Sequence, residues 1–350
     1  MTTLTNTATW REIMAQPAIW QAWATAFDPA PIRAWITSLN APEVWFCGAG
    51  SSAYIGDIIT AALEGHPGPR LRAVPTTDLV ARPHAYLAHS PPLIVSFGRS
   101  GNSAESIGTL DALDALAPVA PRLNITCNAT SALATRQAAH QRSIILPPAT
   151  HDAGFAMTSS LTTMLLTALA VFGPAPDLPT LASTLSRLLP SFTAHATAAR
   201  LPDRVVFTGA GPLAFAAREA ALKVTELSAG QIPALWDSTL GFRHGPKSFV
   251  RGKTDIYVFA SENPHTARYD ADLAHELRSQ FPDSIITTVG PQGDIACPTA
   301  GPAVTLPIVL AQILAATWSH RLGLPVDDPF AGLGTLTRVV AGVQLYPVQP

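Results

Sequence analysis

Short apolar runs alternate with helical patterns along this chain, and the runs form two similar sets. In the first half, runs rich in β-branched and aromatic residues predict strands near residues 43–48, 92–97, 122–127 and 143–146. In the second half, comparable runs predict strands near residues 204–208, 255–260, 284–289 and 303–307. Strands that alternate with helices form right-handed βαβ units. Each half is therefore predicted to be a parallel sheet flanked by helices, a doubly wound, three-layer α/β fold of the flavodoxin-like kind.

Helical patterns also precede and join these halves. Residues 1–40 predict one or two leading helices, and we expect their tryptophans, Trp10, Trp20 and Trp23, to pack on the first domain. A Pro-flanked helical segment near residues 175–200 is the expected join. The predicted organisation is an N-terminal helical segment at 1–34, a first domain at 35–180 and a second domain at 200–345.

The two halves share residues at a fixed spacing. Val44–Asp57 (VWFCGAGSSAYIGD) and Val205–Arg218 (VVFTGAGPLAFAAR) each predict a strand, a Gly-Ala-Gly turn and a helix. The second segment lies 161 positions after the first, and Ile286 follows Ile125 at the same offset. Two segments at one spacing indicate a duplicated domain.

Composition excludes several classes of protein. Of 350 residues, 47% are hydrophobic and 13% charged, which favours a large core and disfavours disorder. The net charge is −2 without a basic run, which disfavours nucleic-acid binding. The N-terminal stretch does not resemble a signal peptide, and the apolar segment Met157–Phe172 is short enough to be a buried helix. We therefore expect a cytoplasmic protein that does not bind membranes.

The cysteines and possible metal ligands show no pattern typical of a redox or metal site. Cys47, Cys127 and Cys297 are widely spaced and form no CxxC motif, so we expect buried, reduced thiols. Clusters of His, Asp, Glu and Cys at metal-ligand spacing do not occur in the sequence. No metal or organic cofactor is expected.

The stretch Val95–Ser106 (VSFGRSGNSAES) carries the strongest chemical signal. It predicts a strand, a loop of small and hydroxyl residues, and a helix that begins near Ala104. The free N–H groups and the dipole of a helix N-terminus favour an anion. Ser100, Asn102 and Ser103 can each donate a further hydrogen bond. The sequence therefore predicts a phosphate site.

A second loop with hydroxyl groups follows the neighbouring strand. Gly48–Ser52 is a weak dinucleotide fingerprint, and the acidic residue expected about twenty positions on is missing, which disfavours NAD. Ser51 and Ser52 either bind a sugar or its phosphate or cap the helix. Two hydroxyl loops at adjacent strand ends favour binding. Arg99 either contacts the ligand or is a solvated loop charge.

A third region combines a lysine, a carboxylate and a histidine. Lys223 and Glu226 are three residues apart on an Ala-rich helix, so they share one face. They form either a surface ion pair or, because the helix is mostly apolar, a partly desolvated base at a pocket wall. His244 follows in a Gly/Pro loop, where a lone histidine is either ordinary or catalytic.

These motifs resemble the sugar isomerase (SIS) domain proteins, with two SIS domains in tandem. The resemblance rests on Val44–Asp57, Ser96–Ser106 and the pairing of LKVTEL with RHGP, and covers roughly residues 35–345. It is greatest to the branch of tagatose-6-phosphate ketose/aldose isomerases and galactosamine-6-phosphate deaminases. A further relative is the isomerase half of glucosamine-6-phosphate synthase.

The resemblance implies a role for each candidate residue. It places the phosphate loop on Arg99, Ser100, Gly101, Asn102 and Ser103, together with Ser52. It makes Glu226 the catalytic carboxylate near Lys223, and His244 a ring-opening group contributed across a dimer interface. Arg338 lies where the synthase carries a Schiff-base lysine, and an arginine does not form an imine. Ser159 and Ser160, which begin a helix, are further binding candidates.

The implied enzyme acts on a sugar phosphate and functions at least as a homodimer. The favoured reaction converts an amino-hexose 6-phosphate, such as galactosamine 6-phosphate, into the ketose 6-phosphate and ammonia. The alternatives are an aldose–ketose isomerase of a neutral sugar phosphate and a phosphosugar sensor without activity.

Overall fold

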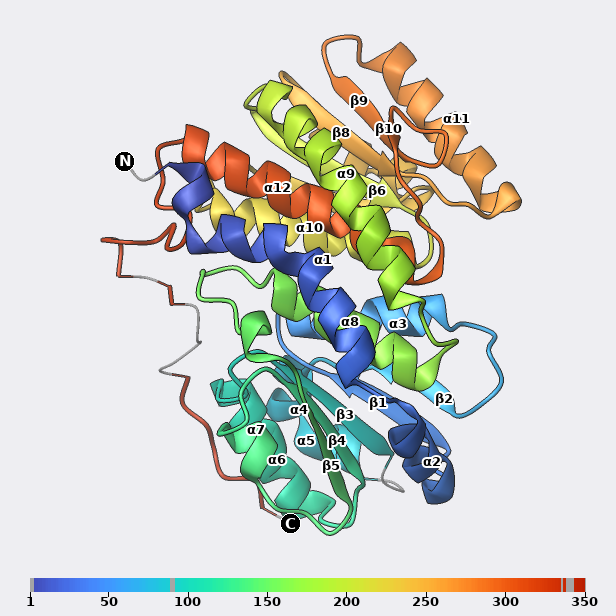
Figure 1. The fold of residues 1–350 in the computed structure, drawn as a ribbon, viewed down its shortest axis with the longest axis vertical. Coiled ribbons are helices and arrows are strands. Elements are labelled where there is room, and N and C mark those ends of the chain that lie inside the picture. Colours follow the sequence, from blue (N-terminus) through green and yellow to red (C-terminus); the bar gives the residue numbers. More distant parts are fainter. Residues whose placement is uncertain (1–2, 89–91, 335, 338–342, 350) are drawn as a thin grey trace. The chain divides into compact units, whose positions relative to one another are not determined.

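The computed structural model describes residues 3–88, 92–334, 336–337 and 343–349, which form two compact units (Figure 1). The N-sheet unit comprises the described residues of Ile19–Asp152, Ser159–Pro176 and Thr335–Pro350. The C-sheet unit comprises the described residues of Met1–Ala18, Ala153–Thr158 and Asp177–Gly334. Both units are thus assembled from separated segments, unlike the consecutive domains that the sequence predicts.

The N-sheet unit is built on a five-stranded parallel sheet with the order β2-β1-β3-β4-β5. The strands are β1 (Glu43–Cys47), β2 (Arg70–Ala73), β3 (Leu93–Gly98), β4 (Arg122–Thr126) and β5 (Gln141–Ile145). Four of them confirm the predicted strands. The sequence missed β2 because its four residues, RLRA, are partly exposed and form no apolar run.

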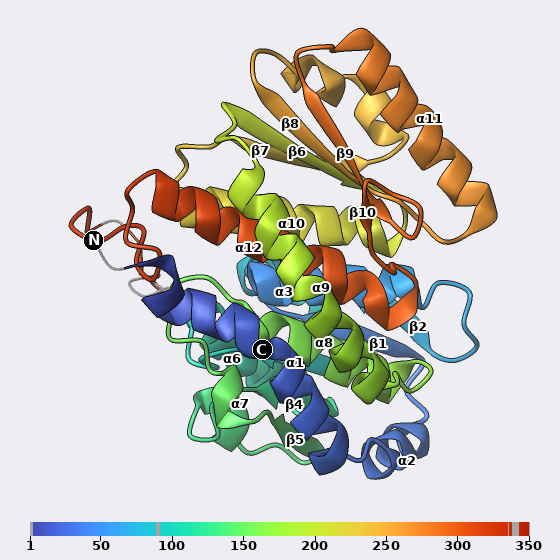
Figure 2. The ribbon, with the colours of Figure 1, turned by 45° about the horizontal axis from the view of Figure 1, so that its top comes forward.

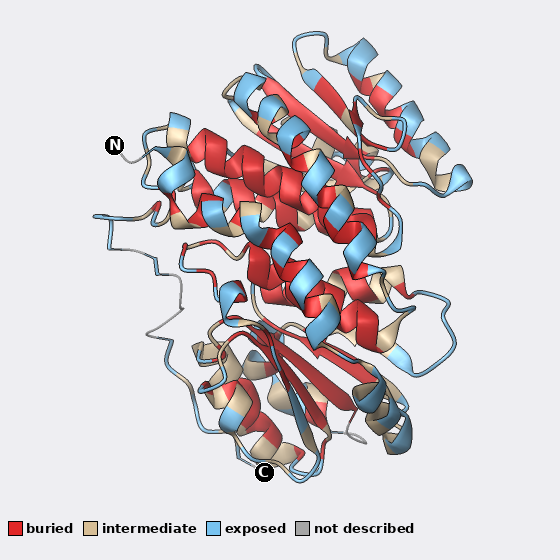
Figure 3. Ribbon diagram, in the orientation of Figure 1, coloured by how far each residue is buried: buried red, intermediate tan, exposed pale blue. Residues whose placement is uncertain are grey.

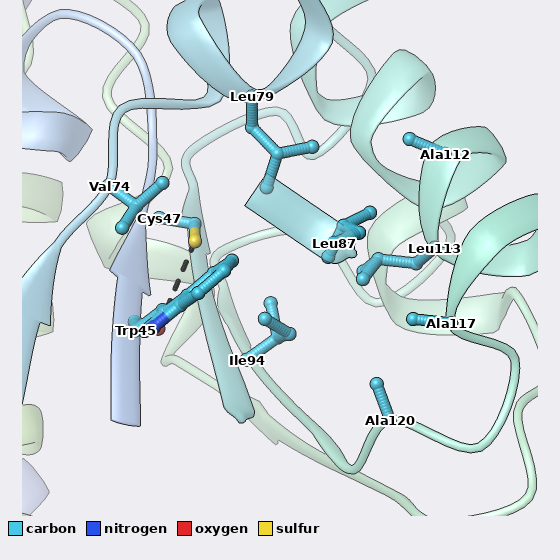
Figure 4. Packing of buried hydrophobic residues seen from close by; sticks show 10 residues of the cluster. All are labelled: Trp45, Cys47, Val74, Leu79, Leu87, Ile94, Ala112, Leu113, Ala117 and Ala120. Carbon is cyan, nitrogen blue, oxygen red and sulfur yellow. Dashed lines mark hydrogen bonds between the residues drawn. The ribbon is translucent and has the colours of Figure 1, made fainter. Parts of the chain in front are cut away.

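Alternate residues of β1 supply the two faces of this sheet. Trp45 and Cys47 join an apolar cluster with Leu79, Leu87 and Leu113 (Figure 4). Those three leucines come from α4 (Thr76–Ala81), α5 (Pro83–Leu87) and α6 (Ala104–Leu116). On the opposite face lie α3 (Ser51–Ala62) and α8 (Ser159–Phe172), where Phe46 of β1 packs edge-on against Phe172. Burial on both faces is the usual state of a parallel sheet.

Shorter elements complete the N-sheet unit. They are α2 (Ala30–Leu39), α7 (Ala132–Thr135) and the 3₁₀ helix η2 (Pro148–Thr150). From the chain's last residues, Val348 packs against the cluster of Trp45, and the backbone oxygen of Gln349 lies 2.8 Å from Nε2 of His84. The C-terminal tail is therefore part of this unit.

The C-sheet unit is built on a five-stranded sheet with the order β10-β9-β8-β6-β7. Read from its other edge, β7-β6-β8-β9-β10, this is the same topology as in the N-sheet. Its parallel strands are β6 (Arg204–Gly209), β7 (Ala234–Ser238), β8 (Thr254–Phe259), β9 (Ile285–Gly290) and β10 (Ile295–Ala296). The predicted strand at 303–307 is wrong, because this run spans η5 (Gly301–Val304) and the start of α12 (Thr305–Arg321). A short apolar run does not distinguish a buried strand from a buried helix.

Helices cover both faces of the C-sheet (Figure 2). One face carries α9 (Leu178–Ala198), α10 (Pro212–Leu227) and α12, and the other carries α11 (Pro264–Gln280). The predicted helical segment near 175–200 corresponds to α9, which groups with this unit. The remaining elements are η1 (Leu4–Asn6), α1 (Ala8–Ala26), η3 (Gly241–His244) and η4 (Pro246–Phe249).

The leading helix does not simply pack on the first domain, as the sequence suggested. The described residues up to Ala18, including Trp10, group with the C-sheet unit, whereas Trp20 and Trp23 belong to the N-sheet unit. Within the C-sheet unit, Nε2 of Gln16 donates to Oε1 of Gln312 in α12 at 2.9 Å. Both side chains are fully buried, so this polar contact fixes the register of α1 on α12.

Among the residues that the structure describes, one helical segment has the length and hydropathy of a membrane span. This is Gly301–Arg321, which includes α12. However, 89% of the most apolar 18-residue stretch of this segment is buried inside the structure. Figure 3 shows how far each residue of the chain is buried. We therefore assign it as the core helix of the C-sheet unit.

The first turns of the two units have the same geometry. Gly50 and Gly211, which precede α3 and α10, have φ/ψ of 56°/−132° and 57°/−129°. A Cβ on Gly48 would lie 2.5 Å from the backbone of Ser52, and one on Gly209 would lie 2.7 Å from that of Leu213. In both units, glycine therefore permits the close approach of a helix to a strand end. This geometry agrees with the repeat seen in the sequence.

Candidate active site

The two hydroxyl loops predicted to bind phosphate lie at one edge of the N-sheet. Strands β1 and β3 are paired neighbours, and they end at Cys47 and Gly98. The helix that follows each strand, α3 or α6, begins at this edge. In the order β2-β1-β3-β4-β5, the gap between β1 and β3 is the topological switch point, where ligands bind in open α/β sheets.

The loop between β3 and α6 is held in place by the segment after β4. Nδ2 of Asn128 donates to the backbone oxygen of Ser100 at 3.1 Å, and Oδ1 of Asn102 accepts from the backbone N–H of Ala132 at 2.8 Å. Gly101 has φ of 63°, and a Cβ there would lie 2.5 Å from Oγ of Ser131. The loop is thus rigid, and Gly101 is required by both its conformation and its neighbours.

Two predicted phosphate ligands also have structural roles in this loop. Ser103 caps α6, because its Oγ accepts from the N–H of Ser106 at 3.3 Å. The oxygen of the Asn102 side chain anchors the start of α7. Ser100 Oγ accepts from the N–H of Asn102 at 3.3 Å. Since a hydroxyl can still donate while it accepts, Ser100 keeps a donor for an anion, and Ser103 keeps one when Oγ of Ser106, 3.0 Å away, is the donor in their contact.

Ser51 and Ser52 are not the cap of α3. The N-cap position is Gly50, and no side chain caps the helix there. Both serines occupy the first turn and are buried, at 4% and 5% exposure. Both residues therefore lie in the first turn of α3, where the helix dipole and the free N–H groups favour negative charge.

Arg99 is buried, at 7% exposure, and is not a solvated loop charge. It lies close enough to Cys127, which follows β4, to act on the thiol electrostatically. Burial raises the pKa of Cys127 to about 12; the side chain of Thr150 lowers it by a hydrogen bond, Asp152 raises it, and Arg99 lowers it by a smaller amount. The arginine thus places a positive charge inside the unit, near the base of the phosphate loop.

Ser159 and Ser160, the further binding candidates, have a structural role at the start of α8. Their hydroxyls donate to Oδ1 and Oδ2 of Asp152 at 2.6 and 2.5 Å, and their backbone N–H groups donate to the same oxygens at 3.1 Å. All three residues are buried, at 0–1% exposure. Asp152 therefore closes the N-terminus of α8, and these contacts occupy the serine hydroxyls. The sequence did not indicate Asp152, because a loop separates it from the helix.

In the C-sheet unit, Lys223 and Glu226 form a close pair on α10. The Nζ of Lys223 lies 2.5 Å from Oε2 of Glu226 and 3.3 Å from Oε1 of Glu219. Lys223 and Glu219 are fully buried, whereas the Glu226 side chain keeps 25% of its surface exposed. This is a buried cation between two carboxylates, of which one reaches the surface, and not a surface ion pair.

The electrostatics keep Lys223 charged. Burial alone would lower the pKa of its ammonium, but Glu219 and Glu226 outweigh burial, and the pKa is raised above its usual value. Glu219 was not among the residues predicted from the sequence, although positions 219, 223 and 226 follow the spacing of one helix face. The protonated lysine holds the carboxylate of Glu226 at the accessible end of the group.

His244 lies in η3 of the same unit, and its ring is exposed. Gly245, which follows it, has φ of 127°, so the backbone turns sharply after the imidazole. Arg338 lies outside the described residues. Within the part of the chain that the structure describes, no group of three or more His, Cys, Asp or Glu side chains could hold a metal ion.

The fold and these sites together define a class of proteins, the SIS domain proteins. The SIS domain family matches residues 39–172, which include both hydroxyl loops. The match reaches the end of α8 and so covers most of the N-sheet unit.

Full-length similarity gives the group within that class. The chain is 39% identical to the D-galactosamine-6-phosphate deaminase AgaS of Escherichia coli, covering 99% of this chain and 97% of that protein. It is also 39% identical to the putative D-galactosamine-6-phosphate deaminase AgaS of Streptomyces coelicolor, covering 96% and 94%. A solved structure, the tagatose-6-phosphate ketose/aldose isomerase of Escherichia coli, has a TM-score of 0.87 and 35% identity, covering 100% and 99%. The chain belongs to the SIS family, in the group of the AgaS proteins.

Proposed function

We propose that this protein is an amino-hexose-6-phosphate deaminase whose substrate is galactosamine 6-phosphate. The enzyme class, a phosphosugar isomerase or deaminase, follows from the relatives and the fold. The observation that carries the choice of deaminase is the 39% identity with AgaS over 99% of the chain. The rigid anion loop and the Lys223–Glu226 pair supply the chemical groups that this reaction needs.

The phosphate group serves as an anchor. It binds to the loop of Arg99, Ser100, Gly101, Asn102 and Ser103 and to Ser51 and Ser52, at the N-termini of α6 and α3. The phosphate lies remote from the reacting carbons, so its binding energy fixes their position without entering the chemistry. A rigid loop makes this anchor effective, because little ordering is left to occur on binding.

The reaction begins with the opening of the sugar ring. His244 moves a proton between the ring oxygen and the hydroxyl on C1, a task suited to an imidazole. Glu226 then removes the proton from C2 as the C1 oxygen gains a proton, which gives an enolamine, and delivers it to C1 as the nitrogen loses a proton. The C2 amine becomes an imine, water adds to it, and ammonia leaves as the C2 ketone forms. Lys223 keeps the carboxylate in place during these transfers.

Three further proposals concern the origin of the C-sheet unit, the assembly of the chain and its location. We propose that the C-sheet unit is a second SIS domain that arose by duplication, which its strand order and its Gly-Ala-Gly turn support. His244 serves the site of a partner chain in a homodimer, and the exposure of its ring agrees with such a role. The proposed location is the cytoplasm, where three buried, unpaired cysteines remain reduced.

The test is a panel of sugar phosphates with two readouts. Galactosamine, glucosamine and mannosamine 6-phosphates are incubated with the protein, ammonium is measured, and products are identified by NMR. We expect ammonium and ketose 6-phosphate in equal amounts, fastest from the galacto isomer. Absence of ammonium from every amino sugar would refute the deaminase.

A second candidate reaction has its own support. The likeness to a structure named as a tagatose-6-phosphate ketose/aldose isomerase favours isomerisation of a neutral sugar phosphate. In that reaction Glu226 performs the same C1–C2 transfer through an enediol, and no ammonium is released. Conversion of tagatose 6-phosphate to an aldose, without turnover of any amino sugar, would identify this activity.

A further inference from the structure

Helix α11 packs against the segment that carries His244. Phe242, two residues before the histidine, is fully buried and shares an apolar cluster with Leu273, Ala274 and Leu277 of α11. These three residues lie within one helix turn of each other and form one face. The backbone just before His244 is therefore fixed against α11.

A single carboxylate of α11 also binds the chain on both sides of His244. Oε2 of Glu276 accepts from Nε of Arg243 at 2.8 Å, and Arg243 directly precedes the histidine. The other oxygen of Glu276 pairs with Nζ of Lys247, three residues after it. Between the two cations lies the sharp turn at Gly245. Glu276 thus bridges the two sides of this turn through Arg243 and Lys247.

A second, buried acid of α11 secures the start of the same segment. The carboxylate of Asp270 accepts from Oγ1 of Thr239 at 2.5 Å and from the N–H of Ser261 at 2.8 Å. Thr239 follows β7 and precedes η3, so Asp270 fastens this loop to the loop after β8. The backbone before the turn is held by Asp270 and Phe242, and Glu276 binds one cation on each side of the turn.

We propose that Glu276 is a positioning residue for His244, which it holds in place for ring opening through Arg243 and Lys247. This rests on the proposed function, in which His244 transfers the ring-opening proton. Partly exposed ion pairs contribute little to stability. A misplaced catalytic group, by contrast, loses rate steeply, because proton transfer needs hydrogen-bond distance and alignment. The expected effect of Glu276 is therefore on one chemical step and not on folding.

Two ketose phosphates separate ring opening from the later proton transfer. Tagatose 6-phosphate closes its ring through the 5-hydroxyl, whereas 5-deoxytagatose 6-phosphate lacks that hydroxyl and stays open. In D₂O with ammonium, Glu226 exchanges the C1 protons of either sugar, and NMR follows the exchange. Ring opening is needed for the first sugar and not for the second.

The variants are Glu276→Gln and, as a matched control, Asp294→Asn. Asp294 pairs with Arg278 of α11 at 2.6 Å, on a solvent-exposed part of the helix. We expect Glu276→Gln to slow exchange into tagatose 6-phosphate about tenfold and to leave the 5-deoxy sugar within twofold of wild type. The control should change neither rate. Glu276→Asp should recover part of the loss.

Equal slowing of both sugars, or slowing of neither, would overturn the positioning role. If Glu276→Gln does not fold, Lys247→Gln removes the ion pair between Glu276 and the residues after the turn, and the same selective loss is expected. A wild-type protein that exchanges neither sugar would refute the proposed function, and the inference with it. A wild-type protein that exchanges both leaves the proposed function standing whatever the variants show.

Discussion

Replacing Lys223 with methionine would leave a buried carboxylate without its cation. Lys223 and Glu219 have no exposed surface, and their charged groups lie 3.3 Å apart. Glu226, at 25% exposure, can turn toward water when the lysine is lost, but Glu219 cannot. Most of the cost of Lys223→Met should therefore come from Glu219.

The size of that cost follows from the burial of the pair. Removing one partner of a buried ion pair costs roughly 3–5 kcal/mol, because the remaining charge is uncompensated. For a unit of this size, such a loss lowers the melting temperature by on the order of 10 °C. Changing Glu219 to glutamine as well removes the stranded charge. The double variant Glu219→Gln/Lys223→Met should then recover most of the lost stability.

Thermal unfolding of the three variants, followed by circular dichroism, measures this cycle. Glu219→Gln alone should cost about 1 kcal/mol, because Lys223 keeps Glu226 as a partner. A Lys223→Met protein within 2 °C of wild type, or a double variant less stable than Lys223→Met, would refute the assignment of a buried charged pair.

Three further predictions concern the alkaline limit of stability, the phosphate loop and the thiols. The pKa of Lys223 is raised on folding. The charged lysine therefore contributes its full stabilisation below about pH 10.4, the pKa in the unfolded chain, and loses it as the pH rises through the higher pKa of the folded state. In melting curves at alkaline pH, wild type should lose this part of its stability and the double variant should not. Gly101→Ala should raise KM about tenfold, since its Cβ would meet Ser131, whereas Gly65→Ala, with φ of 79° and open space around it, should not change KM. Burial raises the pKa of Cys47 and Cys127 to about 12, so at pH 8 both should react with a thiol reagent only after unfolding.

The sequence predicted the sheets well because central parallel strands are apolar on both faces. It missed β2 and β7, whose residues are only partly buried and include charged side chains, and β10, which has only two residues. It also misassigned residues 303–307, where the start of a buried helix has the composition of a strand. The assembly of each unit from separated segments depends on packing, which local patterns do not contain.

The candidate site was predictable to a lesser degree. Spacing along α10 indicated that Lys223 and Glu226 share a face, and the same spacing would have found Glu219. The partners of Ser159, in contrast, depend on Asp152 across a loop, which no periodicity reveals. Likewise, Glu276 reaches Arg243 from an element 33 residues further along the chain. Contacts between distant segments are set by the fold and appear only in the structure.

The central claim is that Glu226 transfers the proton that leads to loss of ammonia. The most direct measurement compares wild type with Glu226→Gln on galactosamine 6-phosphate in D₂O, with ammonium, C1 deuterium and sugar affinity recorded together. Wild type should release ammonium and give ketose 6-phosphate, with deuterium at C1 in proportion to the exchange of the proton on Glu226 with D₂O before it reaches C1. The variant should bind the sugar with Kd near that of wild type and turn over about 10³-fold more slowly. A variant that retains a tenth or more of wild-type turnover would contradict this account.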